Sequence, residues 1–513
     1  MSHTAPAENS SDTATPATIR SWVGLAVLVL PTILLALDMT VLHLVAPRLS
    51  ADLRPSGVQL LWILDVYGFL IASFLITMGT LGDRIGRRKL LLIGAACFGA
   101  ASALAAFATS AEMLIVLRAL LGVAGATLMP STLSLIRNMF HIERERTLAI
   151  TVWMTGFIFG SAVGPLIGGM LLEHFWWGSV FLLGVPVMAL LLITGPLLLP
   201  EFRDENAGRL DLASAGLSVT TLLSVIYGLK TMARDGLTAP ALAALVFGLA
   251  LGTLFARRQR RLADPMLDLS LFANRAFSTS VAALLLTILA LSGAWLMVFQ
   301  YLQGVLGLSP LEAGLVMLPP ALVQVVASFF VPMLSQRMKP ALLAGAGLVL
   351  GAVGLAILSR VPASGSVALL VTGALVMGVG VMPMMILGTD MVVGAAPPEK
   401  TGAASAVSET ASELGMALGV AVIGSIGMAV YRAVLGRALP PGGEAGEMDG
   451  ALETLGGAMG YAASLPTETG AALMDAVRRA FGAALTVNAG IGVGLVLFTA
   501  TLVIVRLRHL GTR

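Results

Sequence analysis

The sequence predicts an all-α membrane protein with fourteen transmembrane helices, and three observations carry this prediction. The 513 residues are 57% hydrophobic and 12% charged, with a mean hydropathy of +0.93, whereas soluble domains carry about 25% charged residues. Apolar stretches of about 20 residues, enough to cross a bilayer, recur along the chain. The 57 glycines suit helices that pack closely in lipid. This composition excludes a soluble enzyme, and the single cysteine, Cys97, excludes a disulfide scaffold.

The chain begins with a polar segment, 1–19, that lacks the pattern of a secretory signal, and we expect a disordered cytoplasmic tail there. Of the fourteen spans that follow, the seventh and eighth are the least certain candidates. The third and fourth are separated only by a tight turn at 109–111. The fourteen candidate spans lie at 22–46, 58–81, 90–109, 112–136, 147–172, 176–199, 211–233, 238–256, 276–304, 311–335, 341–359, 365–391, 402–431 and 481–505.

The distribution of Lys and Arg predicts the orientation, because positively charged loops stay in the cytoplasm. With a cytoplasmic N-terminus, 21 of the 31 Lys and Arg lie in cytoplasmic segments and 9 in external ones. Fourteen spans then place both termini in the cytoplasm, whereas losing one span would move the basic C-terminus outside. The basic linker at 256–275 is interpreted as an orientation signal, and we expect no nucleic-acid partner.

A long external loop is expected at 436–479, before the last span. The segment 440–443 breaks the chain, and two helix-like stretches follow, near 447–463 and 468–480. Apolar residues in both recur at helical spacing, which predicts a packed helical hairpin, with a mobile linker as the alternative. These apolar residues are Leu452, Leu455 and Met459, then Leu473, Val477 and Phe481.

The loop between the second and third spans carries an ordered motif, GTLGDRIGRRK, at 79–89. Its glycines permit a tight turn where two helices approach. Its acid and arginines can pair with each other and with a helix terminus across an interface. We interpret the motif as a gating loop rather than only a positive-inside anchor. The residues assigned to it are Gly79, Asp83, Arg84, Gly86, Arg87 and Arg88.

The fifth span carries glycines at a spacing of four, which draws one stripe along one helix face and lets a neighbouring backbone approach closely. Within this stripe, Pro165 cannot donate its helical hydrogen bond and should bend the helix. A generic packing stripe is the alternative. The residues of this helix motif are Gly160, Gly164, Pro165, Gly168 and Gly169, and Gly156 extends the stripe.

Charged side chains inside the spans are expected to have a function or a partner, because inserting each into the bilayer costs about 2.5–3.5 kcal/mol on the insertion scale. Asp38, Asp65 and Arg118 fall at similar depth in the outer half of the membrane. A buried carboxylate beside an arginine can load and release a proton as its partner or its access to solvent changes. We therefore assign these three residues to proton coupling, with a fixed structural ion pair as the alternative.

Two acids in the thirteenth span, Glu409 and Glu413, lie four residues apart and share a helix face. They predict a cavity that receives a cation or a proton, and pairing with basic groups near the inner rim is the alternative. Asp390 ends the twelfth span and joins this set, although solvation at the rim or loop capping would equally explain it. Aromatic residues that could stack a flat cation are Trp62, Tyr67, Trp153, Phe157, Trp295, Phe299 and Tyr301.

Together these motifs resemble the major facilitator superfamily. The 79–89 loop is similar to its GxxxDRxGRRK motif, and GPLIGG at 164–169 resembles the motif that marks its antiporters. LDMTVL at 37–42, WILDVY at 62–67 and SETASELG at 408–415 resemble the fourteen-span drug:proton antiporters of the QacA, LfrA and SmvA group. The resemblance covers about residues 20–505. The sequence departs from the family pattern at His43, Val45, Leu121 and Gln324.

The resemblance implies two six-helix bundles, at 20–200 and 266–513, around a central cavity, with two inserted helices and a linker at 201–265. It implies a proton-driven antiporter that exports lipophilic cationic drugs, dyes or quaternary ammonium compounds across the bacterial plasma membrane. Its partners would be drugs, protons and lipid, and we expect a monomer. A dedicated exporter of one natural-product antibiotic is the alternative, and a membrane-embedded receptor or enzyme is the remote one.

Nothing in the sequence supports catalysis or ATP-driven pumping. The metalloprotease, nucleotide-binding and serine-nucleophile motifs HExxH, GxxxxGK[ST] and GxSxG do not occur. We therefore expect no metal site and no cofactor, and any pumping should use an ion gradient.

Overall fold

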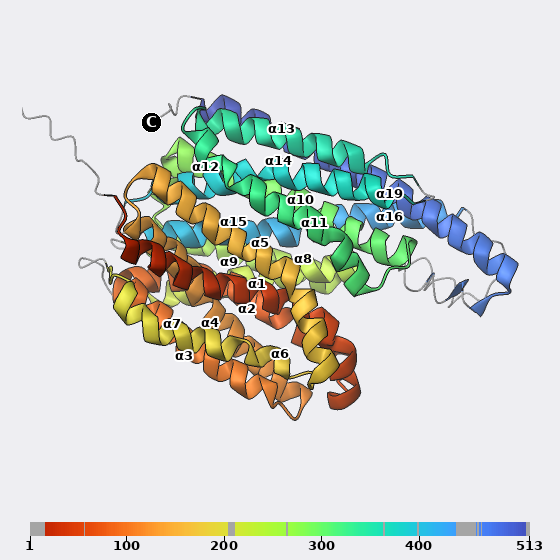
Figure 1. Cartoon of the computed structure of the whole chain (residues 1–513), viewed down its shortest axis with the longest axis horizontal. Helices are drawn as coiled ribbons and strands as arrows, with labels where there is room; N and C mark the ends of the chain where they lie inside the picture. The colour runs from red at the N-terminus through yellow and green to blue at the C-terminus, as the bar shows by residue number, and fades with distance from the viewer. Residues whose placement is uncertain are drawn as a thin grey trace, which may run out of the picture.

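Helices that run parallel to the long axis of the molecule make up the fold (Figure 1). The computed structural model describes residues 16–55, 57–203, 211–262, 265–362, 365–397, 400–437, 458, 461–462 and 464–508. Within these residues all regular structure is helical, and fourteen helices are long and apolar enough to cross a membrane. The predicted fold class is thereby confirmed. The expected disordered tail lies almost wholly outside the described residues.

The first bundle provides six of the fourteen spans. Its core is a continuous cluster of buried Leu, Ala, Ile and Phe side chains between Leu25 and Leu199. The sixth span is interrupted at Leu183, so that a short helix and a longer one share it. The helices are α1 (Ile19–Leu53), α2 (Gly57–Ile85), α3 (Arg87–Ala106), α4 (Ala111–Met139), α5 (Glu143–His174), α6 (Ser179–Leu182) and α7 (Gly184–Leu198).

The second bundle also provides six spans around its own core, which gathers buried side chains between Met266 and Leu507. Two π-helical turns, Tyr301–Val305 and Gly419–Gly424, lie within its first and fifth spans. The helices are α10 (Arg275–Gln300), α11 (Pro310–Ser328), α12 (Phe330–Ser335), α13 (Pro340–Leu358), α14 (Val367–Gly394), α15 (Thr401–Leu418), α16 (Ser425–Leu435) and α19 (Thr467–Leu507).

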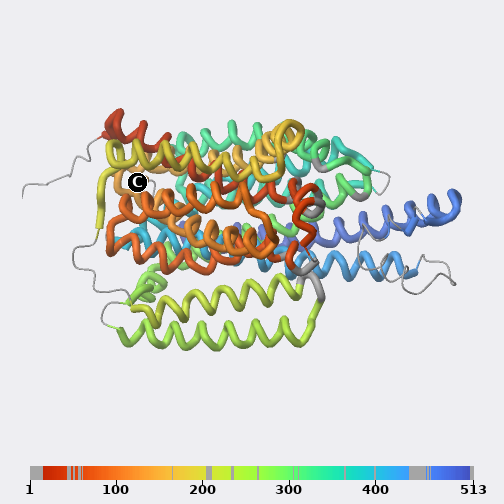
Figure 2. Tube along the Cα trace, turned by 90° about the horizontal axis from the view of Figure 1, so that it is seen from below, coloured from red at the N-terminus to blue at the C-terminus, as the bar shows by residue number. Residues whose placement is uncertain are grey.

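Two inserted helices, α8 (Leu212–Asp235) and α9 (Ala239–Gln259), lie side by side along one flank of the bundles (Figure 2). α8 packs against α2 and α9. Arg258 pairs with Asp211 at 2.7 Å and joins the two ends of this helix pair. Hydrogen bonds from Arg258 and Ser214 hold the pKa of Asp211 below its usual range, so the carboxylate stays ionised.

A linker after α9 returns to the second bundle. Its residue Asp268 accepts a hydrogen bond from Lys400 Nζ at 2.8 Å, directly before α15. Partial burial raises the pKa of Asp268, but hydrogen bonds from Lys400 and Ser270 outweigh that effect and bring the pKa to about 2. The linker is therefore fastened to the start of α15 at any ordinary pH.

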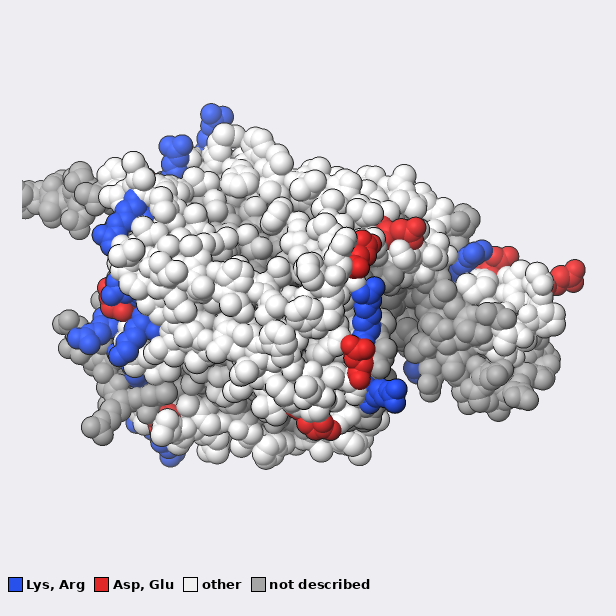
Figure 3. All heavy atoms as spheres, turned by 60° about the horizontal axis from the view of Figure 1, so that its bottom comes forward, with Lys and Arg blue, Asp and Glu red and all other residues white. Residues whose placement is uncertain are grey.

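The two ends of the molecule differ in charge. We call the end where α1 begins and α19 finishes the basic end, and the opposite end, where α16 and α19 project, the hairpin end. On the face drawn in Figure 3, Lys and Arg gather at the basic end, whereas acids and bases are mixed toward the hairpin end. A broad uncharged band separates them, as expected of a surface that faces lipid.

The hairpin end corrects the prediction for 436–479. The stretch predicted as a separate helix at 468–480 is the start of α19, which continues without a break through the last span for 41 residues. It packs against α16, the end of the thirteenth span, and Leu473, Val477 and Phe481 are buried. The two spans therefore extend as a helical pair. The other predicted stretch, 447–463, lies mostly outside the described residues.

Candidate functional site

A cavity of about 850 Å³ lies between the two bundles. It is lined by α1, α4 and α5 from the first bundle and by α10, α11, α14 and α15 from the second. Four of the predicted aromatic residues line it, whereas Trp62, Tyr67 and Tyr301 do not. Methionines from both bundles, among them Met39, Met154, Met382 and Met416, fill much of the remaining wall. The aromatic residues of the wall are Trp153, Phe157, Trp295 and Phe299.

The only acids among the cavity-lining residues are Glu409 and Glu413, one helical turn apart on α15. Among the described residues, neither carboxylate has a hydrogen bond or an ion pair, and neither reaches a basic group at the basic end. Glu413 lies within electrostatic range of Lys230 on α8. Carboxylates without an ion-pair partner, beside aromatic faces and soft thioethers, form a chemical environment that suits a lipophilic cation.

Hydroxyl and amide side chains add hydrogen-bonding capacity to the wall, among them Gln324 and Thr389. Gln324 is buried in α11 and packs against α14 at Gly378, where any side chain would collide with it. Thr389 lies near the basic end of α14, so the cavity reaches deep into the molecule toward that end. The lining therefore combines a broad apolar surface with few polar anchors, which is the usual make-up of a small-molecule site.

Asp38 and Arg118 form a buried ion pair inside the first bundle, with 2.5 Å between Oδ2 and Nη1. Arg118 is 1% exposed. Its Nε donates to the carbonyl of Ile63, and its guanidinium lies 4.3 Å above the centre of the Tyr67 ring. Neither charged residue lines the large cavity. Asp38 instead faces a hollow of about 10 Å³ that Phe98, among others, lines within the same bundle.

Asp65 does not join this pair, although the sequence places it at a similar depth. Its carboxylate accepts a hydrogen bond from Lys230 on the inserted helix α8 at 2.6 Å. Lys230 also lies over the ring of Phe69, 4.7 Å from its centre. One turn away, Trp62 stacks on Tyr227 of α8. Sequence reasoning missed Lys230 as the partner, because it counted this residue among the external loop charges.

Asp390 is neither solvated nor a loop cap, and this corrects the sequence-based interpretation. The side chain is buried, at 5% exposure, and its two oxygens accept hydrogen bonds from Arg146 Nε at 2.5 Å and Thr147 Oγ1 at 3.1 Å. Both donors lie at the start of α5, so the interaction joins the two bundles at the basic end. Arg146 carried no distinguishing sequence signal, because it belongs to a run of charged loop residues.

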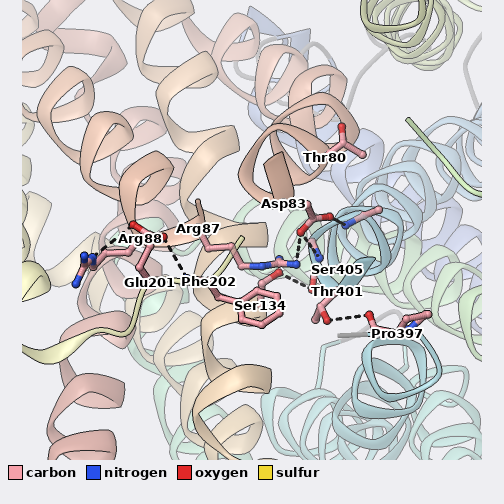
Figure 4. A network of polar contacts seen from close by, with 12 residues as sticks. Thr80, Asp83, Arg87, Arg88, Ser134, Glu201, Phe202, Pro397, Thr401 and Ser405 are labelled. Carbon is pink, nitrogen blue, oxygen red and sulfur yellow. Dashed lines mark hydrogen bonds and ion pairs between the residues drawn. The ribbon is translucent and has the colours of Figure 1, made fainter. Parts of the chain in front are cut away.

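The motif at 79–89 reaches across to the second bundle (Figure 4). Asp83 accepts hydrogen bonds from the backbone N–H groups of Gly402 and Ala403, at 3.1 and 3.0 Å, and pairs with Arg87. Both amides belong to the first turn of α15, where a helix favours a negative charge. The close approach of α2 to α15 needs Gly79, because any side chain there would meet the backbone of Gly402.

On its other side the same motif is fastened to the end of the first bundle. Gly86 has a φ of +108°, which favours glycine, and starts α3. Arg88 donates to the carbonyl of Leu199 at 3.0 Å and lies 3.6 Å from the carboxylate of Glu201 (Figure 4). Arg84 lies in the last turn of α2. The motif therefore bridges α2, α3, the residues after α7, and α15.

We call the contacts of Asp83 with α15, of Ser134 with Ser405 (3.3 Å) and of Arg146 with Asp390 the basic-end seam. All three join the first bundle to the second. Because they lie beyond Thr389, the last cavity residue on α14 toward the basic end, they close the cavity at that end.

The glycine stripe of α5 packs on α1. A side chain at Gly160 would meet the backbone of Ile33, and one at Gly164 would meet Thr40. Gly168 is buried, whereas Gly169 has open space beside it. α5 remains helical through position 165. Because Thr40 and Ser161 both line the cavity, this close packing fixes the wall of the site.

The chain is an all-helical membrane bundle whose two halves enclose a cavity, which is the architecture of a membrane transporter. The chain belongs to the Major Facilitator Superfamily, whose family model matches residues 28–420. It is 48% identical to the multidrug efflux pump LfrA of Mycolicibacterium smegmatis, over 97% of this chain and 98% of that protein. It is 39% identical to the methyl viologen resistance protein SmvA of Salmonella typhimurium, over 90% and 93%.

A solved structure supports the fold. The human organic anion transporter MFSD10 matches with a TM-score of 0.56, covering 94% of this chain and 98% of that one, at 15% identity. Such a low identity supports the fold alone.

Proposed function

We propose that this chain is a proton-driven antiporter that exports lipophilic cationic drugs, dyes or quaternary ammonium compounds. The observation that carries the proposal is the pair of carboxylates, Glu409 and Glu413, that have no ion pair in the described part of the chain and lie in a cavity walled by aromatic and methionine side chains. Such a wall binds flat cations through ring faces and adapts to different shapes through flexible thioethers. The similarity to LfrA and SmvA supports efflux of drugs of this kind.

Two charged sites have different roles in this mechanism. Glu409 and Glu413 receive the cation or a proton in the cavity, and Asp38 with Arg118 carries a proton within the first bundle. Bringing a proton to Asp38 would release Arg118 from its counter-ion, which alters the packing around α1 and α4. Asp65 contacts neither of these two sites and pairs with Lys230 of α8 instead. Asp390 belongs to the cytoplasmic gate rather than to the coupling site.

The direction of transport follows from the orientation. The basic end, which carries both described termini, would face the cytoplasm of a bacterium according to the positive-inside rule. The basic-end seam then joins the two bundles on the cytoplasmic side of the cavity, as expected of an outward-facing arrangement. The bundles at 20–200 and 266–513 would rock about the cavity as a monomer, with Asp83 and its motif as the cytoplasmic gate.

Everted membrane vesicles that contain the chain test the function directly. A fluorescent cationic dye should enter these vesicles when an inside-acid pH gradient is imposed, and it should leave when the gradient is collapsed. A panel of unrelated cations should be carried. Transport of one compound alone would favour a dedicated exporter, and dye movement without dependence on the pH gradient would overturn the proton-driven mechanism.

A further inference from the structure

The amide side chain of Asn488 lies in the core of the second bundle without a hydrogen-bond partner. It is 2% exposed, and neither its nitrogen nor its oxygen has a partner in the described part of the chain. Buried polar groups nearly always have one, because an unmet group in an apolar interior costs free energy. Thr499, three turns further along α19, follows that rule and donates to the carbonyl of Leu495 at 2.8 Å. Packing alone therefore does not explain an amide at position 488.

The amide faces a bare stretch of backbone on α16. A side chain at Gly427 would meet the amide nitrogen of Asn488, so the two helices touch at this point. A helical side chain normally covers the turn that precedes it. Because Gly427 has none, the carbonyl groups one turn earlier, at Ile423 and Gly424, are left uncovered on the side of the amide. These two residues end the π-helical turn Gly419–Gly424. Asn488 therefore faces the junction between this turn and α16.

The π-helical turn connects that junction to the cavity. It directly follows α15, and near its start Ser292 of α10 donates to the carbonyl of Met416 at 3.3 Å. Ser292, Met416 and Glu413 all line the cavity. At Gly419 the turn packs closely on α10, since a side chain there would meet the carbonyl of Leu289. Such π-helical bulges are rare, frequently lie at functional sites and kink helices. A change at the cavity wall can therefore reach α16 through this turn.

We propose that Asn488 is a positioning residue for α16, and that its amide binds the backbone at the end of the π-helical turn only when the basic-end seam is open. This inference rests on the movement between two arrangements in the function proposed above. With the seam closed, the unmet amide raises the free energy of the protein. A small rotation of α16 at the π-helical turn brings the carbonyl of Ile423 or Gly424 to the amide. Asn488 thereby keeps the seam-closed arrangement from becoming a trap.

Asn488→Leu tests the inference, because it removes the unmet amide and keeps a branched side chain. Thr499→Val is the matched control, since it removes a buried hydroxyl of the same helix whose partner lies within that helix. Each is combined with Ser405→Cys and Cys97→Ala, so that labelling by a water-soluble maleimide reports opening of the seam. We expect Asn488→Leu to lower the labelling rate at least fivefold and to slow dye export, while the melting temperature stays equal or rises. Thr499→Val should leave labelling and export within twofold.

An unchanged or faster labelling rate in Asn488→Leu would overturn the inference, and a lower melting temperature beside it would indicate a purely structural role. If Asn488→Leu does not fold, Asn488→Ala takes its place, because it cannot overpack the site, and it should lower the labelling rate in the same direction. Labelling and melting need neither a dye nor a pH gradient. They therefore test the inference even if the unaltered protein shows no pH-driven export, so its failure and that of the proposed function are distinguishable.

Discussion

The ion pair of Asp38 and Arg118 is energetically costly to bury, and it is the pair that we propose carries the proton. Removing one partner from a buried pair typically destabilises a protein by about 3–5 kcal/mol, because the other charge is left uncompensated. Arg118, which is almost fully buried, is held by this pair and by the Ile63 carbonyl. In the proposed mechanism, a proton on Asp38 weakens the main electrostatic contact of Arg118 and thereby alters the packing of the first bundle.

We expect Asp38→Asn to abolish pH-driven export while the protein still inserts. The amide keeps the shape of the side chain but cannot exchange a proton, and the lost charge should lower the melting temperature. Asp65→Asn is the comparison for thermal stability. Its pair with Lys230 is more than one third exposed, and such pairs contribute about 0–1 kcal/mol. Dye efflux and thermal unfolding in detergent measure both variants, and normal export by Asp38→Asn would refute the coupling role.

Glu409 and Glu413 differ in their electrostatic surroundings, although both face the cavity. Lys230 acts on Glu413. We expect Glu413→Gln to weaken binding of cationic dyes at least tenfold and of neutral substrates less than threefold, because the amide no longer neutralises a bound cation. Equilibrium fluorescence binding measures the ratio, with Glu409→Gln as the partner variant. Equal losses for cationic and neutral compounds would instead indicate a role in folding or proton coupling.

At the scale of the helices, the contacts of the basic-end seam join the ends of helices from the two bundles and close the cavity there. Asp83 holds the first turn of α15, and Asp390 holds the start of α5. We expect Asp83→Ala and Asp390→Asn each to shift the protein toward the seam-open arrangement. Ser405→Cys in a Cys97→Ala background reports this shift, because Ser405 is fully buried in the seam. Its labelling by a water-soluble maleimide should rise several-fold. Lost transport with unchanged labelling would argue against gating.

The helical pair at the hairpin end is held by packing rather than by charge. Phe481 lies between Tyr301 and Tyr431, with ring centres 6.3 Å apart in both cases. We expect Phe481→Ala to destabilise this end by about 3–5 kcal/mol, as for other large aromatic residues removed from a core. Arg479→Ala, on the exposed face, is the control. Limited proteolysis from outside should spare 467–480 in the control and cut it in Phe481→Ala, and rapid cutting in the unaltered protein would contradict the ordered pair.

At the scale of the whole molecule, the sequence predicts the fold well because lipid leaves few alternatives. Each span must satisfy its own backbone hydrogen bonds, so length and apolarity fix the number of helices. Contacts that depend on tertiary geometry could not be predicted in this way. The partners of Asp65 and Asp390, Lys230 and Arg146, lie 165 and 244 residues away along the chain. The break in the sixth span and the continuity of α19 likewise depend on how neighbouring helices pack.

The inserted pair α8–α9 contributes few residues to either core, mainly Ala215, Leu222 and Phe255 in the second. Its two ends lie together, since Arg258 contacts Asp211. Replacing 204–262 with a short Gly/Ser linker therefore removes an even number of spans and keeps the orientation of those that follow. We expect the shortened chain to insert and to bind cationic dye, while pH-driven efflux falls, because Asp65 and Glu413 lose Lys230 and α2 loses its packing against α8.

Lys230→Met in the full-length chain separates the two causes. If the lysine charge alone matters, this variant should reproduce the loss of pH-driven efflux of the shortened chain. If the helices act by bracing α2, Lys230→Met should export normally and only the shortened chain should lose efflux. Fluorescence-detected size exclusion checks folding of each variant. Aggregation of the shortened chain under conditions where Lys230→Met is monodisperse would show that α8 and α9 are instead required for the bundles to fold.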